Sequence, residues 1–324
     1  MSVSALPLVG EADVRRVVTV ADALAVVEQT YADFGASRLS LSSPAITRLG
    51  DGARGFGLKG ALLDRYGVAG VRMTPTHTQG RNSWCLVLET ESGRPLVAVE
   101  ETWLHRLRTA ASAAVAARLL ARPDSKVLTL VGAGRIARLV PAAFAEAFDL
   151  DEIRVVARGA ASAAEFAARQ AVPGVTVGAA AHLDDAAPGS DIVVAITSAG
   201  TPVVHPRHLA AGGTLIGLGG GAEISAATLT GEGASGASGA GPVDRFFVDD
   251  LGYARESGSV AGWLAAGLSP ETVGVHLTGP LPAVAAGLLP GRTSPGDRVL
   301  AVVQGVAACD VALACLTMRR LGIA

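Results

Sequence analysis

The sequence predicts a two-domain α/β protein, with a doubly wound parallel sheet in one domain and a smaller α+β arrangement in the other. The chain has 324 residues, more than one small core usually holds. Beyond Pro123, unbroken Val/Ile/Leu runs alternate with helical segments, which indicates parallel strands covered on both faces. Residues 40–100 instead carry short β-type runs separated by Gly, Pro and Ser-Gly turns, which indicates an antiparallel sheet.

Residues 1–122 are predicted to form the first part of the smaller domain. The segment ADALAVVEQTYADFG (21–35) repeats apolar residues at helical spacing and ends on a glycine, as an amphipathic helix does. After the antiparallel runs, TWLHRLRTAASAAVAARLLAR (102–122) is predicted to be one long helix. This helix would lead into the second domain.

Residues 123–290 are predicted to form the parallel sheet and its helices. Strands are expected at 126–132, 152–158, 190–198 and 213–219, with RFFVDD (245–250) as the last strand. Helices are expected at 135–148 and 162–171. The small-residue segment GEGASGASGAG (231–241) is expected to be a mobile surface insertion.

The tail, residues 291–324, is predicted to return to the first domain. Its segment DRVLAVVQGVAACDVALACLTMRRLG (297–322) is apolar over most of its length and is expected to be one long helix. The smaller domain would then be built from both chain ends.

Composition excludes several classes of partner. The chain carries 27 Lys and Arg against 29 Asp and Glu, a balance that favours neither nucleic acid nor an anionic membrane. Cys85, Cys309 and Cys315 lack metal-ligand spacing, so we expect reduced thiols and no metal site. Without a signal-peptide pattern or an apolar run of about 20 residues, a cytoplasmic location is expected.

A glycine loop follows the first strand of the predicted parallel sheet. In KVLTLVGAGRIARLV, Gly132 would make the tight turn and Gly134 would let the backbone approach a pyrophosphate. The small side chain of Ala137 would permit close packing of helix on strand, and the helix N-terminus would offer free N–H groups. The loop therefore predicts a dinucleotide site of the Rossmann type, which includes Arg135 and Ile136.

The end of the next strand indicates the type of dinucleotide. Enzymes that bind NAD usually carry a carboxylate there for the ribose hydroxyls, whereas this chain has Ala157 followed by Arg158. A guanidinium can pair with a 2′-phosphate, and no acid opposes it. We therefore expect NADP as the cofactor, with NAD as the other possibility.

A second glycine loop raises a question of assignment. TLIGLGGGAEIS (214–225) also runs from a β-branched strand into glycines, and both loops cannot hold the same pyrophosphate. A strand that enters glycine is equally a place where a substrate can come close to backbone. Its role is therefore to be decided by the rest of the site.

A long stretch of the chain resembles the ornithine cyclodeaminase/mu-crystallin family. Residues 91–138 join the hairpin ESGRPL, the helix RTAASAAVAA and the loop GAG in that family's order. Further agreement lies in SDIVVAITSAGTPVV, FVDDLGYARESGSV and GRTSPGDRVLAVVQGVAACDVA. The resemblance implies a homodimer with a Rossmann domain and a substrate and dimerisation domain. It also implies cyclodeaminase, ketimine or cyclic imine reductase, or amino-acid dehydrogenase activity.

The resemblance also implies roles for individual residues. Arg108 would pair with the α-carboxylate of the substrate, since a planar guanidinium matches a planar carboxylate. Lys59 and Arg72 are the two further cations available to the substrate, and their order is left open. The residues expected at the cofactor are Thr109 and Ser112 on the helix, and Thr197, Ser198 and Gly219 in later loops.

The second glycine loop departs from the family pattern. Gly221 takes the place of an aspartate that would face the nicotinamide, and whether Glu223 replaces that acid is left open. Glu89 is expected to be structural. His77 and His105 have no partner at a diagnostic spacing, so neither is expected to act in catalysis.

These observations predict an NADP(H)-dependent oxidoreductase. Hydride would pass between the nicotinamide and the α-carbon of an imino or amino acid, the small-molecule partner. Cyclodeamination of ornithine needs an acid for the distal amine, whereas an iminium already carries its proton. Two alternatives stay open: a cyclodeaminase of an unusual diamino acid that uses Glu223, and a non-catalytic, NADPH-dependent binder of small ligands.

Overall fold

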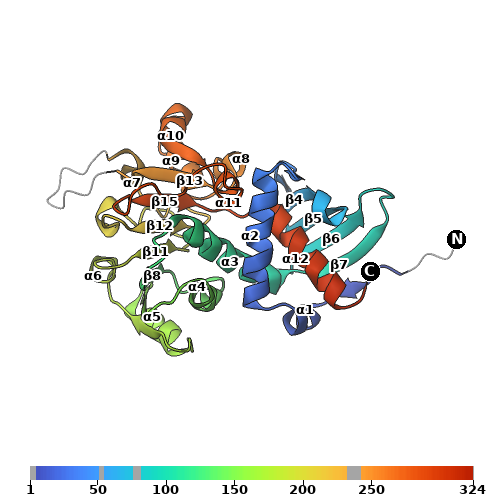
Figure 1. Ribbon diagram of the computed structural model, residues 1–324, viewed down its shortest axis with the longest axis horizontal. Helices are drawn as coiled ribbons and strands as arrows, with labels where there is room; N and C mark the ends of the chain where they lie inside the picture. The colour runs from blue at the N-terminus through green and yellow to red at the C-terminus, as the bar shows by residue number, and fades with distance from the viewer. Residues whose placement is uncertain (1–4, 51–54, 76–81, 232–241, 324) are drawn as a thin grey trace.

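The chain folds into two β-sheets with their surrounding helices, and a largely buried helix joins the two halves (Figure 1). The computed structural model describes residues 5–50, 55–75, 82–231 and 242–323. The predicted fold class, an α/β chain with a parallel sheet and a second, mixed sheet, is confirmed. The predicted insertion at 231–241 lies, from residue 232 on, outside the described residues, as does His77.

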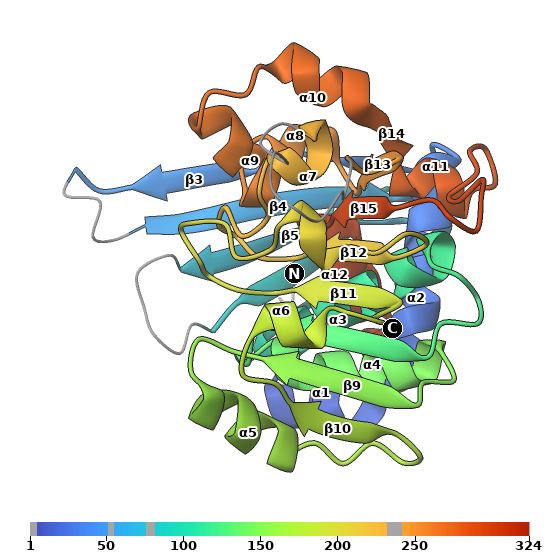
Figure 2. The ribbon, with the colours of Figure 1, turned by 90° about the vertical axis from the view of Figure 1, so that its left-hand side faces the viewer.

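The parallel sheet has eight strands, and all of its described pairings are parallel (Figure 2). In spatial order they are β10 (Thr176–Ala179), β9 (Glu152–Val156), β8 (Val127–Val131), β11 (Ile192–Ala195), β12 (Thr214–Gly217), β15 (Val299–Val302), β13 (Arg245–Val248) and β14 (Leu277–Pro280). Its helices are α4 (Val140–Ala147), α5 (Ala160–Ala168), α6 (Leu183–Ala186), α7 (Ala227–Thr230), α8 (Leu251–Ala254), α9 (Gly258–Ala265), α10 (Pro270–His276) and α11 (Leu281–Ala285). The central strands β8, β11, β12 and β15 are buried, as continuous apolar runs require.

The second sheet has seven strands and is antiparallel apart from its first pair. Its order is β1 (Leu8–Val9), β7 (Pro95–Glu100), β6 (Trp84–Glu89), β5 (Val68–Pro75), β4 (Gly55–Leu63) and β2 (Leu39–Leu41), with β3 (Ala45–Arg48) also on β4. Helices α1 (Glu11–Val17), α2 (Val20–Gly35) and α12 (Ala307–Arg320) lie at this end of the molecule (Figure 1). Helix α12 packs so closely on the sheet that a Cβ at Gly70 would lie 2.6 Å from Val311.

Helix α3 (Thr102–Leu120) joins the two halves, close to the predicted span 102–122. It packs against α2, α4 and α12 and reaches β12. Its small Ala side chains allow these close approaches, and most of its residues are buried. Three short 3₁₀ turns, η1 (Asp64–Tyr66), η2 (Ala137–Leu139) and η3 (Pro206–His208), complete the described elements.

Three predictions of local structure are corrected. The segment 297–322 is not one helix, because its run VLAV forms β15 between β12 and β13, and α12 follows Gly305, whose φ is 81°. RFFVDD is therefore not the last strand, since β14 and β15 come later. The helix expected at 135–148 begins only at Val140, after η2. A short buried apolar run fits strand and helix equally well by periodicity, which explains the first error.

No helix within the described ranges is long and apolar enough to span a membrane.

Candidate active site

The glycine loop after β8 is open to a ligand. Gly132 has a φ of 121°, and a Cβ there would lie 2.4 Å from the Ile196 carbonyl oxygen, so only glycine fits. A Cβ at Gly134 would meet nothing within 4 Å. No described residue accepts a hydrogen bond from the N–H groups of Gly134, Arg135 and Ile136. The loop therefore presents free backbone donors, which suits a diphosphate.

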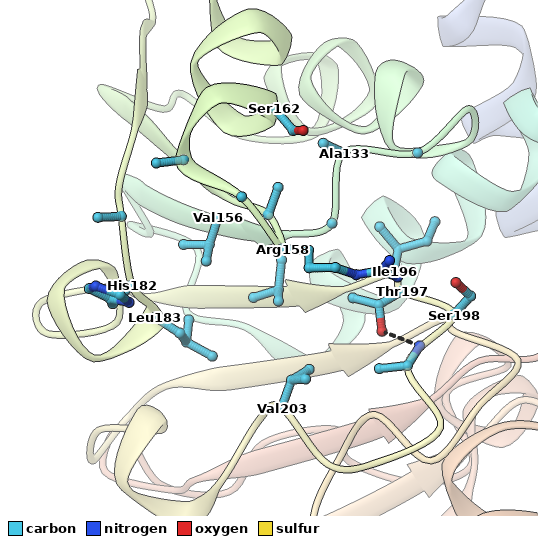
Figure 3. A pocket seen from close by; sticks show the side chains of 18 residues that line it. Ala133, Val156, Arg158, Ser162, His182, Leu183, Ile196, Thr197, Ser198 and Val203 are labelled. Atoms are coloured by element: carbon cyan, nitrogen blue, oxygen red, sulfur yellow. Dashed lines mark hydrogen bonds between the residues drawn. The ribbon is translucent and has the colours of Figure 1, made fainter.

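A cleft of about 980 Å³ opens in front of this loop (Figure 3). It lies where the strand order reverses, between β8 and β11, the usual place for a ligand in a doubly wound sheet. Residues that follow four strands line it: Gly132 and Gly134 after β8, Ala157 and Arg158 after β9, His182 and Leu183 after β10, and Ile196, Thr197 and Ser198 after β11. A cleft of this size at this place can hold a dinucleotide.

Arg158 is the cation of the cleft. Its side chain extends across the cleft toward Ile196 and Thr197 (Figure 3), and no described acidic residue pairs with it. The described lining contains neither Asp nor Glu. An added phosphate would therefore meet a free guanidinium and no opposing charge.

A second cavity, of about 440 Å³, continues from the cleft. The two share Gly134, Ile196, Thr197 and Ser198. The second cavity reaches Arg72, Thr74, Ser83, His105, Arg106, Arg135, Ile136, Gly219 and Gly220. The two glycine loops thus have different places: the first lines both the cleft and the adjoining cavity, whereas Gly219 and Gly220 of the second line only the adjoining cavity.

In the second glycine loop, the backbone donor of Gly219 is hydrogen-bonded to an acid of the same loop, Glu223. Glu223 has no exposed surface, and its carboxylate accepts hydrogen bonds from Gly219 N (2.7 Å), Thr197 N (2.7 Å) and Thr197 Oγ1 (2.8 Å). Burial raises the pKa of Glu223, against these hydrogen bonds, which lower it. A Cβ at Gly221 would lie 2.3 Å from the Ala199 carbonyl oxygen. With this backbone, therefore, position 221 admits no acidic side chain, and Glu223 is not among the described residues that line the cavity.

Ion pairs from three elements lie behind the cavity. Arg72 on β5 pairs with the buried Glu101 at the start of α3, and Arg108 on α3 pairs with Asp310 on α12 at 2.7 Å. Burial raises the pKa of Glu101 to about 8, although Arg72 lowers it. Against the cost of burial, Arg108 holds the pKa of Asp310 well below its usual value. Among the described residues that line the cavity are Arg72, Arg106 and Arg135 but no Asp or Glu, so positive charge dominates its lining.

His105 stands between this charged wall and the cavity. Its Nδ1 lies 2.8 Å from Arg108 Nη2, and 28% of its side chain is exposed. Burial, with Arg72 and Arg108, lowers the pKa of His105 well below its ordinary value, so the ring is neutral near pH 7. The sequence analysis gave His105 no role. The spacing of three residues to Arg108, which puts both on one helix face, was the available signal.

Comparison with known proteins identifies the family. The family model described as the ornithine cyclodeaminase/mu-crystallin family matches residues 65–321. The chain belongs to this family. A putative dehydrogenase of Rhizobium meliloti is 31% identical over 254 residues, which is 75% of this chain and 71% of that protein. An ornithine cyclodeaminase of Agrobacterium tumefaciens is 29% identical over 137 residues, 41% of this chain and 38% of that protein.

A solved structure shares the fold of this ornithine cyclodeaminase/mu-crystallin family member. It is the Δ1-pyrroline-2-carboxylate reductase of Thermococcus litoralis in complex with NADH and L-proline. The TM-score is 0.86, with 97% of each chain covered and 20% sequence identity. At that identity the likeness concerns the fold alone.

Several residues that the family resemblance assigned lie away from the two cavities. Arg108 is only 2% exposed, and Thr109 Oγ1 donates to the His105 carbonyl oxygen at 2.7 Å. Ser112 is wholly buried. None of the three is among the residues that line the cleft or the cavity. In this family member, packing inside the molecule positions these side chains of α3.

Lys59 and Arg72 are register partners on β4 and β5, yet they reach different spaces. Arg72 lines the cavity beside the cleft. Lys59 Nζ lies 3.3 Å from the Gly305 carbonyl oxygen and 3.3 Å from the ring centroid of Tyr253, in a separate cavity of about 230 Å³. Burial lowers the pKa of Lys59 to about 7, with contributions from Arg108 and Arg72.

Within the part of the chain that the structure describes, the partners of the Glu89 carboxylate lie in its own turn. Ser92 Oγ donates to its carboxylate across the β6–β7 turn, and Arg94 lies 3.6 Å away. These contacts agree with the structural role expected for it. No described group of three His, Cys, Asp or Glu residues could hold a metal ion.

Proposed function

We propose that this chain is an NADP(H)-dependent oxidoreductase that transfers hydride between the nicotinamide and the α-carbon of a 2-imino or 2-amino acid. The observation that carries the proposal is the continuity of the two cavities. A dinucleotide held on the loop at Gly134 would extend its nicotinamide past Thr197 toward Arg72 and His105. A substrate there would lie against the ring with its carboxylate near a cation. The likeness to an ornithine cyclodeaminase supports an activity on C–N bonds.

The lining of the cavity favours reduction of a C=N bond over ring closure of a diamine. Among its described residues there is no Asp or Glu, and Glu223 is engaged by Gly219 and Thr197. Ring closure needs a group that manages the protons of a distal amine. An iminium ion already carries its proton, so a hydride donor and a carboxylate site suffice.

Arg158 supports NADP as the preferred cofactor. Its guanidinium is unpaired among the described residues and lies at the end of β9, where the ribose of a bound dinucleotide is expected. A 2′-phosphate there gains a charge-assisted hydrogen bond that NAD lacks. NAD would still find the diphosphate site.

The function is tested by turnover. The purified chain is mixed with NADPH and a panel of cyclic 2-imino acids of five- and six-membered rings, and nicotinamide absorbance is followed. We expect NADPH consumption with at least one of them and production of the matching cyclic amino acid. No consumption with any member contradicts the proposal. Ammonia release from a diamino acid without net NADPH consumption would identify a cyclodeaminase, and tight NADPH binding without turnover a ligand-binding protein.

We also propose that the chain forms a homodimer through the outer face of its seven-stranded sheet, and that it works in the reducing cytoplasm. Phe56, Leu62 and Met73 are exposed by 44%, 47% and 38% on that face, opposite α12. An apolar face of this kind favours burial against a second copy. The free, buried thiols of Cys85, Cys309 and Cys315 support the location. Light scattering should give a dimer for the wild type and a monomer for Leu62→Glu, whereas a monomeric wild type contradicts the dimer.

A further inference from the structure

We propose that the substrate is a dicarboxylic 2-imino or 2-amino acid, and that Arg106 on α3 binds its distal carboxylate. The inference rests on the proposed function, which it deepens by naming the class of substrate. The distal site is separate from the place of the α-carboxylate near Arg72, because Arg72 lies on β5 and Arg106 on α3, in a different part of the cavity lining.

The cavity carries more positive charge than one carboxylate neutralises. Arg72, Arg106 and Arg135 line it, and its described lining contains no Asp or Glu. Arg72 already pairs with Glu101. No acidic residue of the described ranges forms an ion pair with Arg106 or Arg135. A substrate with a single carboxylate, held near Arg72, would therefore leave two guanidinium groups of the lining without a partner.

Arg106 lies within a cluster of guanidinium groups. Burial lowers the pKa of Arg106, and Arg135, Arg15 and Arg138 lower it further, whereas Glu11 raises it. Glu11 is itself paired with Arg15 at 2.7 Å. An arginine keeps its proton near pH 7, so these like charges repel one another. An anion bound at Arg106 would relieve that repulsion.

The position of Arg106 fits a group on the substrate better than a group on the cofactor. Neither Arg106 nor Arg135 is among the described residues that line the cleft. Arg106 follows Thr102 by about one turn of α3, and both line the adjoining cavity. The volume of that cavity, about 440 Å³, lies in the range of sites for small molecules. An anion at Arg106 would therefore be part of the molecule that occupies this cavity.

The test compares amino acids of equal length that differ only in the distal group. L-Glutamate is paired with L-norvaline, and L-aspartate with L-2-aminobutyrate, so that a methyl group replaces the distal carboxylate in each pair. Each probe is measured by calorimetry on the full chain loaded with NADPH. Amino acid and NADPH are both in the reduced state and cannot react with each other, so the titration measures binding alone.

The variants separate contact with the distal carboxylate from a general effect of charge. Arg106→Met keeps an apolar stem of similar length, and Arg106→Lys keeps the charge. Arg138→Met is the matched control, because Arg138 belongs to the same cluster but is exposed and is not among the described residues that line the cavity. The NADPH affinity and the melting temperature of each variant are measured first.

We expect the wild type to bind the dicarboxylic member of at least one pair about 10- to 100-fold more tightly than its partner, the effect of one hydrogen bond between charged groups. Arg106→Met should lose most of this preference, while its affinity for the monocarboxylic partner should change by less than about threefold. Arg106→Lys should keep part of the preference, and Arg138→Met should match the wild type. NADPH affinity should not change in any variant.

A wild type that binds no probe, or both members of each pair equally, overturns the inference. A preference that survives in Arg106→Met, or that falls equally in Arg138→Met, overturns the role of Arg106. A loss of NADPH affinity in Arg106→Met would place Arg106 at the diphosphate and overturn that role as well.

These results are independent of turnover. A wild type that prefers the dicarboxylic probes but reduces no imine contradicts the proposed function and leaves the distal site standing. A wild type that reduces imines and shows no such preference supports the proposed function and overturns the inference.

Discussion

The two glycine loops have almost the same sequence character and opposite structures. Each follows a buried parallel strand, β8 or β12, and each contains a glycine that admits no side chain. The first loop leaves the N–H groups of Gly134, Arg135 and Ile136 without a described acceptor, in front of the cleft. In the other loop, Gly219 N donates to Glu223, and a Cβ at Gly219 would lie 2.4 Å from the same carboxylate.

The difference teaches that a glycine loop binds an anion only when the chain has not already supplied one. Glu223 provides a carboxylate where an external anion would otherwise bind, and it occupies the backbone donors of Gly219 and Thr197. Glycine content alone does not distinguish the two loops. They differ in that the second has an acid, Glu223, four residues after Gly219.

The largest effect is expected at Gly134. Gly134→Ala adds a methyl group that meets no atom of the protein but occupies the space in front of the free amides. NADPH affinity should fall by about 10- to 100-fold while the melting temperature stays within about 1 °C of the wild type. Gly178→Ala on β10, where an added Cβ also meets nothing, is the control for both measurements. Unchanged NADPH affinity in Gly134→Ala would remove the first loop from the cofactor site.

Glu223→Gln breaks the second loop. One of the oxygens that accept from Thr197 and Gly219 becomes a donor, which costs about 1–3 kcal/mol, or a fall of roughly 2–10 °C in melting temperature. Glu256→Gln, at an exposed position, should have no effect on melting. If Glu223→Gln melts like the wild type and loses all turnover, Glu223 is a catalytic acid and the contrast between the loops fails.

Arg158→Ser changes only the choice of cofactor at the first loop. NADPH affinity should fall by about tenfold, because one charge-assisted hydrogen bond is lost, and NADH affinity should stay the same. Both are read from fluorescence titrations. Arg169→Ser, directly after α5, removes a guanidinium that pairs with Glu165 and should leave both affinities unaltered. A parallel fall for NADPH and NADH would show that Arg158 does not recognise the 2′-phosphate.

The smallest effect concerns Lys59, outside both loops. Because burial lowers its pKa to about 7, the unfolded chain binds one more proton than the folded chain from there up to about pH 10. Stability contributed by this site therefore rises with pH across that window. The melting temperature of the wild type minus that of Lys59→Met should increase by about 2–4 °C from pH 7 to pH 9.5.

Lys126→Met is the matched control for Lys59, because Asp149 raises the pKa of this exposed lysine. Its difference curve should not rise across the same range. A flat curve for Lys59→Met would show that Lys59 keeps its proton in the folded protein.

The sequence predicted what short-range patterns determine. The strand before Gly132, the turn expected at this glycine and the absent acid at Ala157 are all local features. The strand β15 was missed because the four residues of VLAV are all apolar, so they show neither helical nor strand periodicity. Its place between β12 and β13 depends on pairing with strands that are distant in the sequence.

The wall of the cavity could not be predicted for the same reason. Arg108 and Asp310 are 202 residues apart in the chain, and their ion pair decides that Arg108 turns toward α12 and toward His105. The inward turn of Glu223 depends likewise on Thr197, 26 residues earlier. The residue types indicated what kind of site to expect, whereas packing between distant segments determined which side chains reach the cavity.

A crystal structure of the full chain with NADP⁺ and pyrrole-2-carboxylate tests the central claim most directly. The account predicts the diphosphate on the amides of Gly134, Arg135 and Ile136, and the carboxylate in the adjoining cavity lined by Arg72, with Glu223 still bound to Gly219. A dinucleotide seated on the second glycine loop, or a carboxylate bound outside that cavity, would contradict it.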